Sequence, residues 1–525
     1  MTTKNFAKVY SAQTTLLSAQ IIDIEVDLSK GLHAFSVVGL PDKAVEESRD
    51  RVSAAIKNSG FKSPKAKNQK IVISLAPADL KKEGPVFDLG IALAYLLSCD
   101  EIRFNPEGKL FLGELSLDGY LRKINGTLPI VLEAKKRGFK QVFLPKENGD
   151  EAALIDGIEV YGAESLKEVI EHLDEKRPAS PSQGGGENKL IEPQEKTEAP
   201  NKRADYSIDF GDIKGQERAK RGLEIAAAGG HNIAMFGPPG TGKTMLAKAF
   251  CHILPSLSFD DALETTSIHS IAGTLNETLM TNPPFRTPHH TSSHVAIVGG
   301  GAVPKPGEIT LAHRGVLFLD EFPEFERRVV EALRQPLEDR VISISRAKGS
   351  AMFPASFILV AAMNPCPCGN FGSTKRCICT PTTLERYKRK ISGPIIDRID
   401  MWIEVSNISH EKLSEKSGEN RESEMKRKNI LRAREIQKQR FDGVKRNIKT
   451  NSEMNSKDLT NLVELGEAAR GTLNSAARAM DLSPRAYHRV IKLARTIADL
   501  DENENVEENH ILEALQYRPK QTHEM

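Results

Sequence analysis

The sequence has almost no excess of charge of either sign. It contains 73 lysines and arginines against 71 aspartates and glutamates, which leaves a net charge of +2. So balanced a chain gives no whole-molecule electrostatic reason to bind nucleic acid, and any such surface must be a local basic patch. Hydrophobic residues make up 39% and charged residues 27% of the 525, which suits a soluble globular protein of roughly three or four domains.

Long apolar runs are also missing. The amino terminus lacks the hydrophobic core of a secretory signal. The most apolar stretch nearby, Gly90–Cys99, is shorter than the about 20 residues that span a bilayer. Cysteine is scarce, and four of the six cysteines lie within Cys366–Cys379, which favours a metal site over a disulfide framework. We expect a cytoplasmic protein with no membrane partner.

Short alternating strands and helices make up residues 1–172, the first predicted domain. Ile21–Val26 and Ile71–Leu75 have the pattern of strands, and Ala44–Asn58 has that of an amphipathic helix. Residues 173–204 are rich in Pro, Gly, Glu and Lys and poor in aromatics, so we expect a flexible linker there. The sequence contains no internal repeat.

Two further domains follow the linker. Over 205–406, strands alternate with helices, which predicts an α/β domain with a mainly parallel sheet. Its predicted elements are the helices Gly215–Ala228 and Met245–Ile253 and the strands Asn232–Phe236, Val316–Leu319 and Phe357–Ala362. Over 407–525 the strands cease, which predicts a helical domain. Its predicted helices are Glu422–Arg440, Ser456–Leu465, Gly471–Met480, Pro484–Leu500 and Val506–Tyr517.

A glycine-rich loop directly follows the predicted strand Asn232–Phe236. Its sequence, GPPGTGKT, fits G-x-x-x-x-G-K-[ST] completely and opens a predicted helix, which is the context the motif requires. Glycines let backbone N–H groups turn toward phosphates, and the helix N-terminus adds positive potential. We expect Lys243 to reach the β- and γ-phosphates of ATP and Thr244 to bind Mg²⁺. The expected nucleotide-binding residues are Gly237, Pro238, Pro239, Gly240, Thr241, Gly242, Lys243 and Thr244.

Two carboxylates end the predicted strand Val316–Leu319. This arrangement places Asp320 near the metal and Glu321 near the attacking water. Paired acids at a strand end also occur in solvated turns, but a complete P-loop in the same domain favours the catalytic interpretation. The two motifs together predict a P-loop nucleoside triphosphate hydrolase.

The acidic pair, followed by an apolar strand ending in Asn364, resembles the AAA+ class of ATPases. The resemblance implies that Asn364 is a sensor that helps to orient the water. Residues 392–400, SGPIIDRID, resemble the arginine-finger segment of the magnesium-chelatase and replicative-helicase branch, so Arg398 would enter the neighbouring subunit's site. Arg485, at the start of a predicted helix, looks like the second sensor, on the γ-phosphate in cis. Either arginine is alternatively an ordinary surface or salt-bridge residue.

A finger supplied in trans implies a homo-oligomeric ring, and a hexamer is the family expectation. Four longer stretches make the resemblance more specific: GQERAKRGLEIAAAGGHN (215–232), PFRTPHHTSS (284–293), GGGAVPKPGEITLAHRGVLFLDEFPEF (299–325) and NPCPCGNFG (364–372). With them, nearly the whole chain outside the linker resembles the ComM/YifB family of magnesium-chelatase-related AAA+ ATPases. The resemblance implies ATP- and Mg²⁺-dependent work on DNA, as a ring helicase that migrates branched DNA in recombination and natural transformation.

The first domain resembles the Lon protease domain, a fold of the ribosomal S5 domain-2-like α+β type. The likeness lies in KKEGPVFDLGIALA (81–94), GELSLDGYLRKINGTLP (113–129) and VFLPKEN (142–148). Lon-type proteolysis needs a serine after the Gly-Pro and a later lysine, but the corresponding positions hold Val86 and about Leu128. Without a nucleophile and its base there is no covalent chemistry, so we expect a binding or ring-organising domain.

Cys366, Cys368, Cys377 and Cys379 form two C-x-C pairs in one short loop. Four thiolates suit a tetrahedral, structural Zn²⁺ site. The C-x-C spacing is less diagnostic than C-x-x-C, and two alternatives stay open: four unliganded thiols, or an iron–sulfur cluster. His289 and His290 are another conspicuous pair, but we expect adjacent histidines to face different ways and to have a role in the loop rather than in metal binding.

Three basic residues are candidates for DNA contact. Arg346 and Lys348 lie at the turn of a predicted hairpin over 341–354, and Lys305 lies in a loop that resembles a pore-lining insertion of this branch. Positive loops that line a channel would track phosphates irrespective of sequence. Solvated hairpin tips are the alternative. The predicted helix Glu422–Arg440 is also strongly basic, although most such runs are solvated faces.

Two other functions fit parts of the sequence. The ATPase subunit of a magnesium-chelatase-type metal-insertion enzyme would share the ATPase core, but the Lon-like domain and the cysteine loop fit it badly. A protein-remodelling chaperone would favour an aromatic pore loop, whereas basic and small residues stand at these positions. We therefore expect a sequence-nonspecific DNA motor.

Overall fold

The computed structural model describes residues 5–176, 190–197, 208–301, 305–346, 349–371, 375–408 and 422–519. The chain divides into two compact units. The first comprises residues 1–201 and 262–280, and the second comprises residues 202–261 and 281–525. No helix among the described residues is long and apolar enough to span a membrane.

The first unit is built on a mixed seven-stranded sheet with the order β3-β4-β2-β1-β5-β8-β9. β1, β2 and β4 pair antiparallel, whereas β3 joins β4 in parallel and β5, β8 and β9 extend the other side in parallel. In sheet order the strands are Ala34–Val38, Gln69–Ala76, Ser18–Lys30, Phe6–Thr15, Lys109–Phe111, Gln141–Pro145 and Glu159–Ala163. The small pair β6 (Glu114–Leu115) and β7 (Leu121–Arg122) lies outside it. The predicted strands Ile21–Val26 and Ile71–Leu75 are thus confirmed within β2 and β4.

A buried helix, α2 (Asp88–Ser98), is the centre of this unit's core. Every residue of α2 is buried, and the helix packs on β1, β2 and α1. An apolar helix of this kind, DLGIALAYLLS, belongs inside a domain rather than on its surface. The other helices of the first 176 residues are α1 (Lys43–Asn58), α3 (Thr127–Lys136), α4 (Gly149–Ala152) and α5 (Leu166–Leu173).

Two segments join this unit that the sequence assigned elsewhere. Residues 190–197, expected to be part of a flexible linker, lie along β9: the Gln194 N–H donates to the Val160 carbonyl at 2.7 Å, and Ile191 packs on the core. Helix α8 (Phe259–Ala272) belongs by sequence to the ATPase block, yet residues 262–280 pack with the first unit. There Ser270 Oγ donates to Glu151 and accepts the Gly126 N–H. The segment is therefore an integral part of this unit.

The second unit contains a five-stranded, wholly parallel sheet with the order β11-β14-β17-β10-β18. The strands are Phe285–Arg286, Val316–Leu319, Ile358–Met363, Ile233–Phe236 and Met401–Glu404. Two hairpins project from it, β12–β13 (Gly299–Gly300 with Lys305–Pro306) and β15–β16 (Val341–Arg346 with Gly349–Pro354). The helices before residue 400 are α6 (Glu217–Gly229), α7 (Lys243–Ile253), α9 (His294–Val298), α10 (Glu308–Leu311), α11 (Arg327–Ala332), α12 (Arg334–Asp339), α13 (Pro381–Lys388) and α14 (Gly393–Ile396). The α/β domain with a parallel sheet is as predicted.

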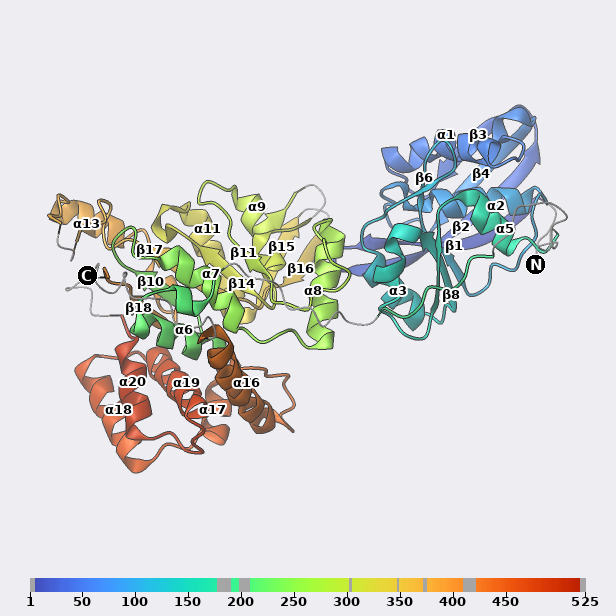
Figure 1. Ribbon diagram of the computed structural model, residues 1–525. Coiled ribbons are helices and arrows are strands. Elements are labelled where there is room, and N and C mark those ends of the chain that lie inside the picture. Colours follow the sequence, from blue (N-terminus) through green and yellow to red (C-terminus); the bar gives the residue numbers. More distant parts are fainter. Residues whose placement is uncertain are drawn as a thin grey trace. The chain divides into compact units, whose positions relative to one another are not determined.

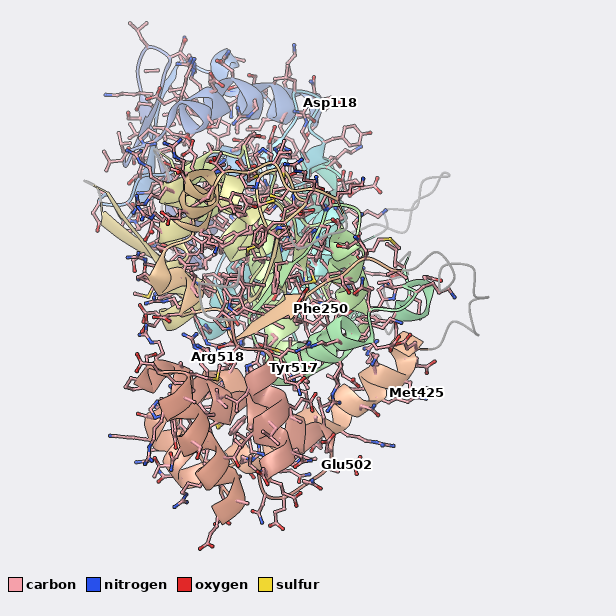
Figure 2. The ribbon with its side chains drawn as sticks, turned by 90° about the vertical axis from the view of Figure 1, so that its left-hand side faces the viewer. Asp118, Phe250, Met425, Glu502, Tyr517 and Arg518 are labelled. Atoms are coloured by element: carbon pink, nitrogen blue, oxygen red, sulfur yellow. The ribbon has the colours of Figure 1, made fainter. Side chains whose placement is uncertain are left out.

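Helices after residue 420 form a bundle beside α6 (Figure 1). They are α16 (Glu422–Phe441), α17 (Ser456–Leu462), α18 (Glu467–Ala479), α19 (Pro484–Leu500) and α20 (Glu508–Gln516). Bundle and sheet share one hydrophobic core. Figure 2 shows Tyr517 and Arg518 at the top of the bundle, where the Trp402 N–H of β18 donates to the Tyr517 carbonyl at 2.8 Å. The helical region is confirmed; its separation from 205–406 as a domain of its own stays a prediction.

Candidate active site

The P-loop lies between β10 and α7 as the motif requires. A Cβ at Gly237 would lie 2.0 Å from the Val405 carbonyl oxygen, so only glycine fits where the loop leaves the sheet. Gly242 has φ +89°, a left-handed conformation, and it immediately precedes α7. The first turn of α7 contains no acidic residue, so its N-terminal N–H groups keep their positive potential for an anion.

Lys243 points back into its own loop. Its ammonium donates to the carbonyls of Gly237 and Pro238 at 2.7 and 2.8 Å and to Asn364 Oδ1 at 3.2 Å. Burial lowers the pKa of Lys243. The structure thus brings the P-loop lysine together with Asn364, which directly follows β17, the neighbour of β10 in the sheet. In this structure two neutral carbonyl oxygens accept hydrogen bonds from the ammonium. Phosphate oxygens of a bound nucleotide would take their place.

Thr244 and Asp320 meet at the same end of the sheet. Thr244 Oγ1 donates to Asp320 Oδ2 at 2.9 Å. A hydroxyl and a carboxylate this close offer the oxygen ligands that Mg²⁺ prefers, one from the P-loop helix and one from the end of β14. The described residues therefore fit a magnesium ion held with the nucleotide.

Glu321, the next residue, has a left-handed backbone with φ +52°. Such a conformation is costly outside glycine and is found preferentially at functional sites. Its exposed carboxylate lies 3.0 Å from Nδ1 of His290. The sequence singled out the histidine pair but missed this contact. The expectation that the two rings face apart is wrong, since their centroids lie 4.2 Å apart; the alternation argument applies to strands, and no strand contains these residues.

Arg398 and Arg485 converge on one carboxylate rather than on the P-loop. Arg398 bonds one oxygen of Glu338, and Arg485 bonds the other at 2.6 Å. All three residues line a cavity of about 870 Å³, whose described lining does not include residues 237–244. A contact of Arg485 with the γ-phosphate of its own chain stays a prediction, and it requires Arg485 to leave Glu338.

The cysteine loop brings its four sulfurs together. All lie within 4.8 Å of one another, and Sγ of Cys366 lies 3.3 Å from that of Cys368 and 3.8 Å from that of Cys377. Tetrahedral zinc with Zn–S bonds of about 2.3 Å needs sulfurs about 3.8 Å apart. Hydrogen bonds from the backbone of Asn370 and Ile378 lower the pKa of Cys368 to about 6, whereas desolvation and hydrogen bonds to neighbouring sulfurs raise the pKa values of Cys377 and Cys379. The donor set therefore fits a closed Cys₄ metal site.

This loop packs directly on the P-loop. A Cβ at Gly369 would lie 2.7 Å from Cδ of Pro239. After the fourth cysteine, α13 returns the chain to the nucleotide site, where the Tyr387 hydroxyl donates to the Asn364 carbonyl at 3.1 Å. The cysteine loop thus starts after Asn364, and the helix that follows it returns to contact Asn364. Because Gly369 packs on Pro239, the loop also directly contacts the phosphate-binding backbone.

The candidate DNA-contact residues lie on the two hairpins. Lys305 of β13 is exposed, Arg346 ends β15 without a described side chain, and Lys348 lies outside the described residues. The predicted hairpin over 341–354 is confirmed. The basic helix α16 is different, because its cations have partners within the chain. The ion pairs are Lys426–Glu224, Lys428–Glu424, Arg432–Glu502, Lys438–Glu435 and Arg440–Asp499.

Comparison with known proteins finds relatives that match nearly the whole chain. The family described as "Magnesium chelatase, subunit ChlI" matches residues 209–413, "Subunit ChlI of Mg-chelatase" matches 24–148, and the C-terminal family of the same subunit matches 420–518. The competence protein ComM of Haemophilus influenzae is 42% identical over 98% of this chain and 97% of its own length. YifB of Escherichia coli is 41% identical over 96% of this chain and 95% of its own.

The chain belongs to the ComM/YifB family. Membership makes it a magnesium-chelatase-related ATPase of the AAA+ type, for which ATP and Mg²⁺ are the expected substrate and cofactor. A more distant likeness is to Lon protease homolog 2 of Caenorhabditis elegans, 27% identical over 32% of this chain and 23% of that protein. The P-loop and the acidic strand end thus lie within the matched ATPase segment.

Proposed function

We propose that this ComM/YifB-family chain works in the cytoplasm as a homo-oligomeric ring, a hexamer, that hydrolyses ATP to move on DNA. Branched recombination intermediates are the proposed substrate. The observation that carries the proposal is the division of the catalytic set. Lys243, Thr244 and Asp320 meet at one site, whereas Arg398 and Arg485 meet at a cavity that the P-loop does not line.

Each group at the first site has a defined task. Bound Mg²⁺ would neutralise developing phosphate charge, and Thr244 and Asp320 would hold it. When nucleotide binds, the Lys243 ammonium leaves the carbonyls of Gly237 and Pro238 and donates to phosphate oxygens instead. Asn364 also accepts a hydrogen bond from this ammonium, so it responds to the change. Glu321 accepts the hydrogen bond of the attacking water. No arginine completes this set from within the chain as described, so we assign Arg398 of a neighbouring copy to the transition-state charge.

Mixing two inactive variants tests the ring. Arg398→Ala keeps an intact P-loop, and Lys243→Ala keeps an intact finger, so each alone is expected to lack turnover. In a randomly mixed ring at equal amounts, about a quarter of interfaces combine the intact halves, and ATPase activity returns accordingly. If the mixture stays as inactive as its components while each variant still assembles, Arg398 does not act in trans.

The DNA part of the proposal rests on the family likeness, on a relative named for competence and on the exposed Lys305. The test measures ATP turnover with branched, duplex and single-stranded DNA, using Lys243→Ala as the blank. We expect stimulation, strongest with branched DNA, that weakens with added salt and is lost when Lys305, Arg346 and Lys348 become alanine. Robust basal turnover without response to any DNA would overturn the DNA role and leave the ATPase intact.

We also propose that the cysteine loop holds one structural Zn²⁺. The mutual sulfur distances and the packing of Gly369 on Pro239 support a metal that stiffens the backbone beside the P-loop. Metal analysis of purified chain is expected to give one equivalent of zinc, lost in Cys377→Ser. Less than about half an equivalent of zinc, or stoichiometric iron with sulfide, would overturn the assignment.

The first unit is proposed to be a Lon-protease-like domain of the S5 domain-2 type that performs no proteolysis. Val86 and buried Leu128 stand where the nucleophile and its base would be, so neither position has an acid–base group. The Leu128 N–H and Ser270 Oγ both donate to Glu151 Oε1, so residues 262–280 cover this region. Peptidase activity of the purified chain that persists in Lys243→Ala would contradict the proposal.

A further inference from the structure

Arg398, the proposed finger, lies in a short turn between α14 and β18. Its guanidinium donates to the Pro394 carbonyl at 2.7 Å and pairs with Glu338. These contacts orient the side chain, but they do not fix the backbone from which it extends. A misplacement of about 1 Å can cost about 10²-fold in rate. The residues that hold the backbone of this turn therefore affect how well one chain can serve its neighbour's site.

Asn232 contacts the backbone of the turn at two residues. Its side-chain Nδ2 donates to the Arg398 carbonyl at 3.3 Å. Its backbone N–H donates to Asp400 Oδ2 at 3.0 Å, and its carbonyl accepts the Asp400 N–H, also at 3.0 Å. Removal of the Asn232 side chain would take away the donor to Arg398 while leaving the backbone contacts in place.

The helical bundle holds the same turn from another direction. Arg489 of α19 donates to the Ile399 carbonyl at 3.3 Å, and its Nε lies 3.5 Å from Asp400 Oδ1. The turn is thus held both by the bundle, through Arg489, and by the sheet, through Asn232. These two contacts restrict the positions that the backbone of Arg398 can take.

The second polar atom of the Asn232 side chain contacts the strand that leads to Asn364. Its Oδ1 accepts the Leu359 N–H of β17 at 2.9 Å, and Asn232 itself directly precedes β10. β17, β10 and β18 are neighbours in the sheet (Figure 1). At their other ends, β10 leads into the P-loop and β17 leads to Asn364. One amide group therefore joins the turn that contains Arg398 to the two strands that carry the chain's own nucleotide site.

We propose that Asn232 is a positioning residue for Arg398, and that it sets the place of the finger that this chain offers to the next ATP site. The Nδ2 donor fixes the Arg398 carbonyl, and the Oδ1 acceptor fixes the amide against β17. The inference rests on the proposed role of Arg398 in trans and deepens it by naming the group that places the finger. Loss of the Asn232 donor should therefore impair the neighbour's site and spare the chain's own P-loop.

Mixed rings of full-length chains separate these two sites. Asn232→Asp has the same shape and keeps an acceptor for the Leu359 N–H, but it puts a carboxylate oxygen against the Arg398 carbonyl. The change is added either to Lys243→Ala, the chain that supplies the finger, or to Arg398→Ala, the chain that supplies the P-loop. The reference is the mixture of Arg398→Ala and Lys243→Ala with no further change.

The expected result is an asymmetry between the two placements. In the finger-supplying chain, Asn232→Asp is expected to lower the recovered kcat by about 10- to 100-fold, the cost of a misplaced finger. In the P-loop-supplying chain, the same change is expected to leave kcat and the KM for ATP at the reference values. Asn429→Asp is the matched control, because this amide of α16 donates to Glu224 at 3.4 Å and should change kcat in neither chain.

The outcomes distinguish this inference from the proposed function. Asn232→Ala, which introduces no charge, repeats the test if Asn232→Asp folds poorly. Equal losses in both placements with both variants, a loss confined to the P-loop-supplying chain, or no loss at all would overturn the positioning role. A working reference without the asymmetry removes only the role of Asn232. If the reference mixture is itself inactive, the trans role of Arg398 fails, and the positioning role fails with it.

Discussion

The two compact units each contain one acidic side chain whose setting is the opposite of the other's. In the first, Asp88 is fully buried at the start of α2, where it binds Arg51 through both oxygens and accepts the Leu115 N–H. In the second, Glu321 is exposed, has a left-handed backbone and has a single histidine partner. A buried carboxylate whose two oxygens accept three hydrogen bonds holds a fold together, whereas an exposed one on strained backbone is available for chemistry. Asp88 and Glu321 thus illustrate how burial and backbone conformation separate a structural acid from one available for chemistry.

The largest expected effect comes from Glu321→Gln. Removing the proposed acceptor of the water's hydrogen bond should lower turnover by about 10²–10⁴-fold while ATP still binds. Glu324→Gln is the matched control, because this acid lies three residues later and pairs with Lys390 at the surface. Turnover and nucleotide binding measured on both variants check the prediction. Near-normal turnover in Glu321→Gln would move the catalytic role elsewhere.

Asp88→Ala tests the structural side of the comparison. Breaking a buried pair leaves Arg51 uncompensated and should cost about 3–5 kcal/mol in the free energy of unfolding of the first unit. Asp50→Ala, on the neighbouring helix, removes an exposed pair with Lys65 and should change it by less than about 1 kcal/mol. Denaturant unfolding followed by a probe in the first unit measures both. Equal effects would show that burial does not set the difference.

Ser270→Ala tests whether residues 262–280 contribute to the free energy of unfolding of the first unit. The change removes a donor to Glu151 and leaves the Gly126 N–H without its acceptor, at a cost of about 1–3 kcal/mol to that unit. Ser267→Ala is the control, since its hydroxyl bonds only the Leu263 carbonyl of its own helix. The same unfolding measurement applies. A destabilised second unit with an unchanged first would contradict the assignment.

The smallest expected effect is that of Glu338→Gln. Its ion pairs with Arg398 and Arg485 are partly exposed, so their loss should cost only about 0.2–1 kcal/mol of stability. Glu385→Gln, which removes an exposed pair with Arg389, provides the reference. Urea unfolding of the second unit compares them. A loss well above 1 kcal/mol would mean that Glu338 organises the cavity rather than merely pairing with the arginines.

Local sequence signals predicted the elements that local physics determines. The bounds of β14 and α19 are those expected, because an apolar run ending in two acids and a Ser-Pro cap define them without help from the rest of the chain. Helix α17 ends at Leu462, three residues early, since Leu465 forms a bridge with Val506. Such a partner, 41 residues along the chain by their numbering, has no local signature.

The site divides in the same way. The P-loop, Asp320 and the cysteine cluster were predictable, because a contiguous motif contains each of them. The His290–Glu321 contact, the shared Glu338 and the packing of residues 190–197 on β9 depend on residues far apart in sequence. Composition was misleading in that last segment, since a polar, proline-containing stretch still bonds to the backbone of an edge strand.

Helix α8 has a consequence for how the protein is made. Its first turn is anchored in the second unit, where Asp261 pairs with Arg314 and Lys449, and its later turns complete the first. During synthesis the first 201 residues therefore leave the ribosome before residues 262–280, which complete their fold, have been made. The amino-terminal unit must wait, incomplete, for residues 262–280, and maturation of the two units is interleaved rather than sequential. A single cut of the chain between residues 201 and 262 would therefore leave the two fragments associated, because residues 262–280 of the second fragment are part of the first unit.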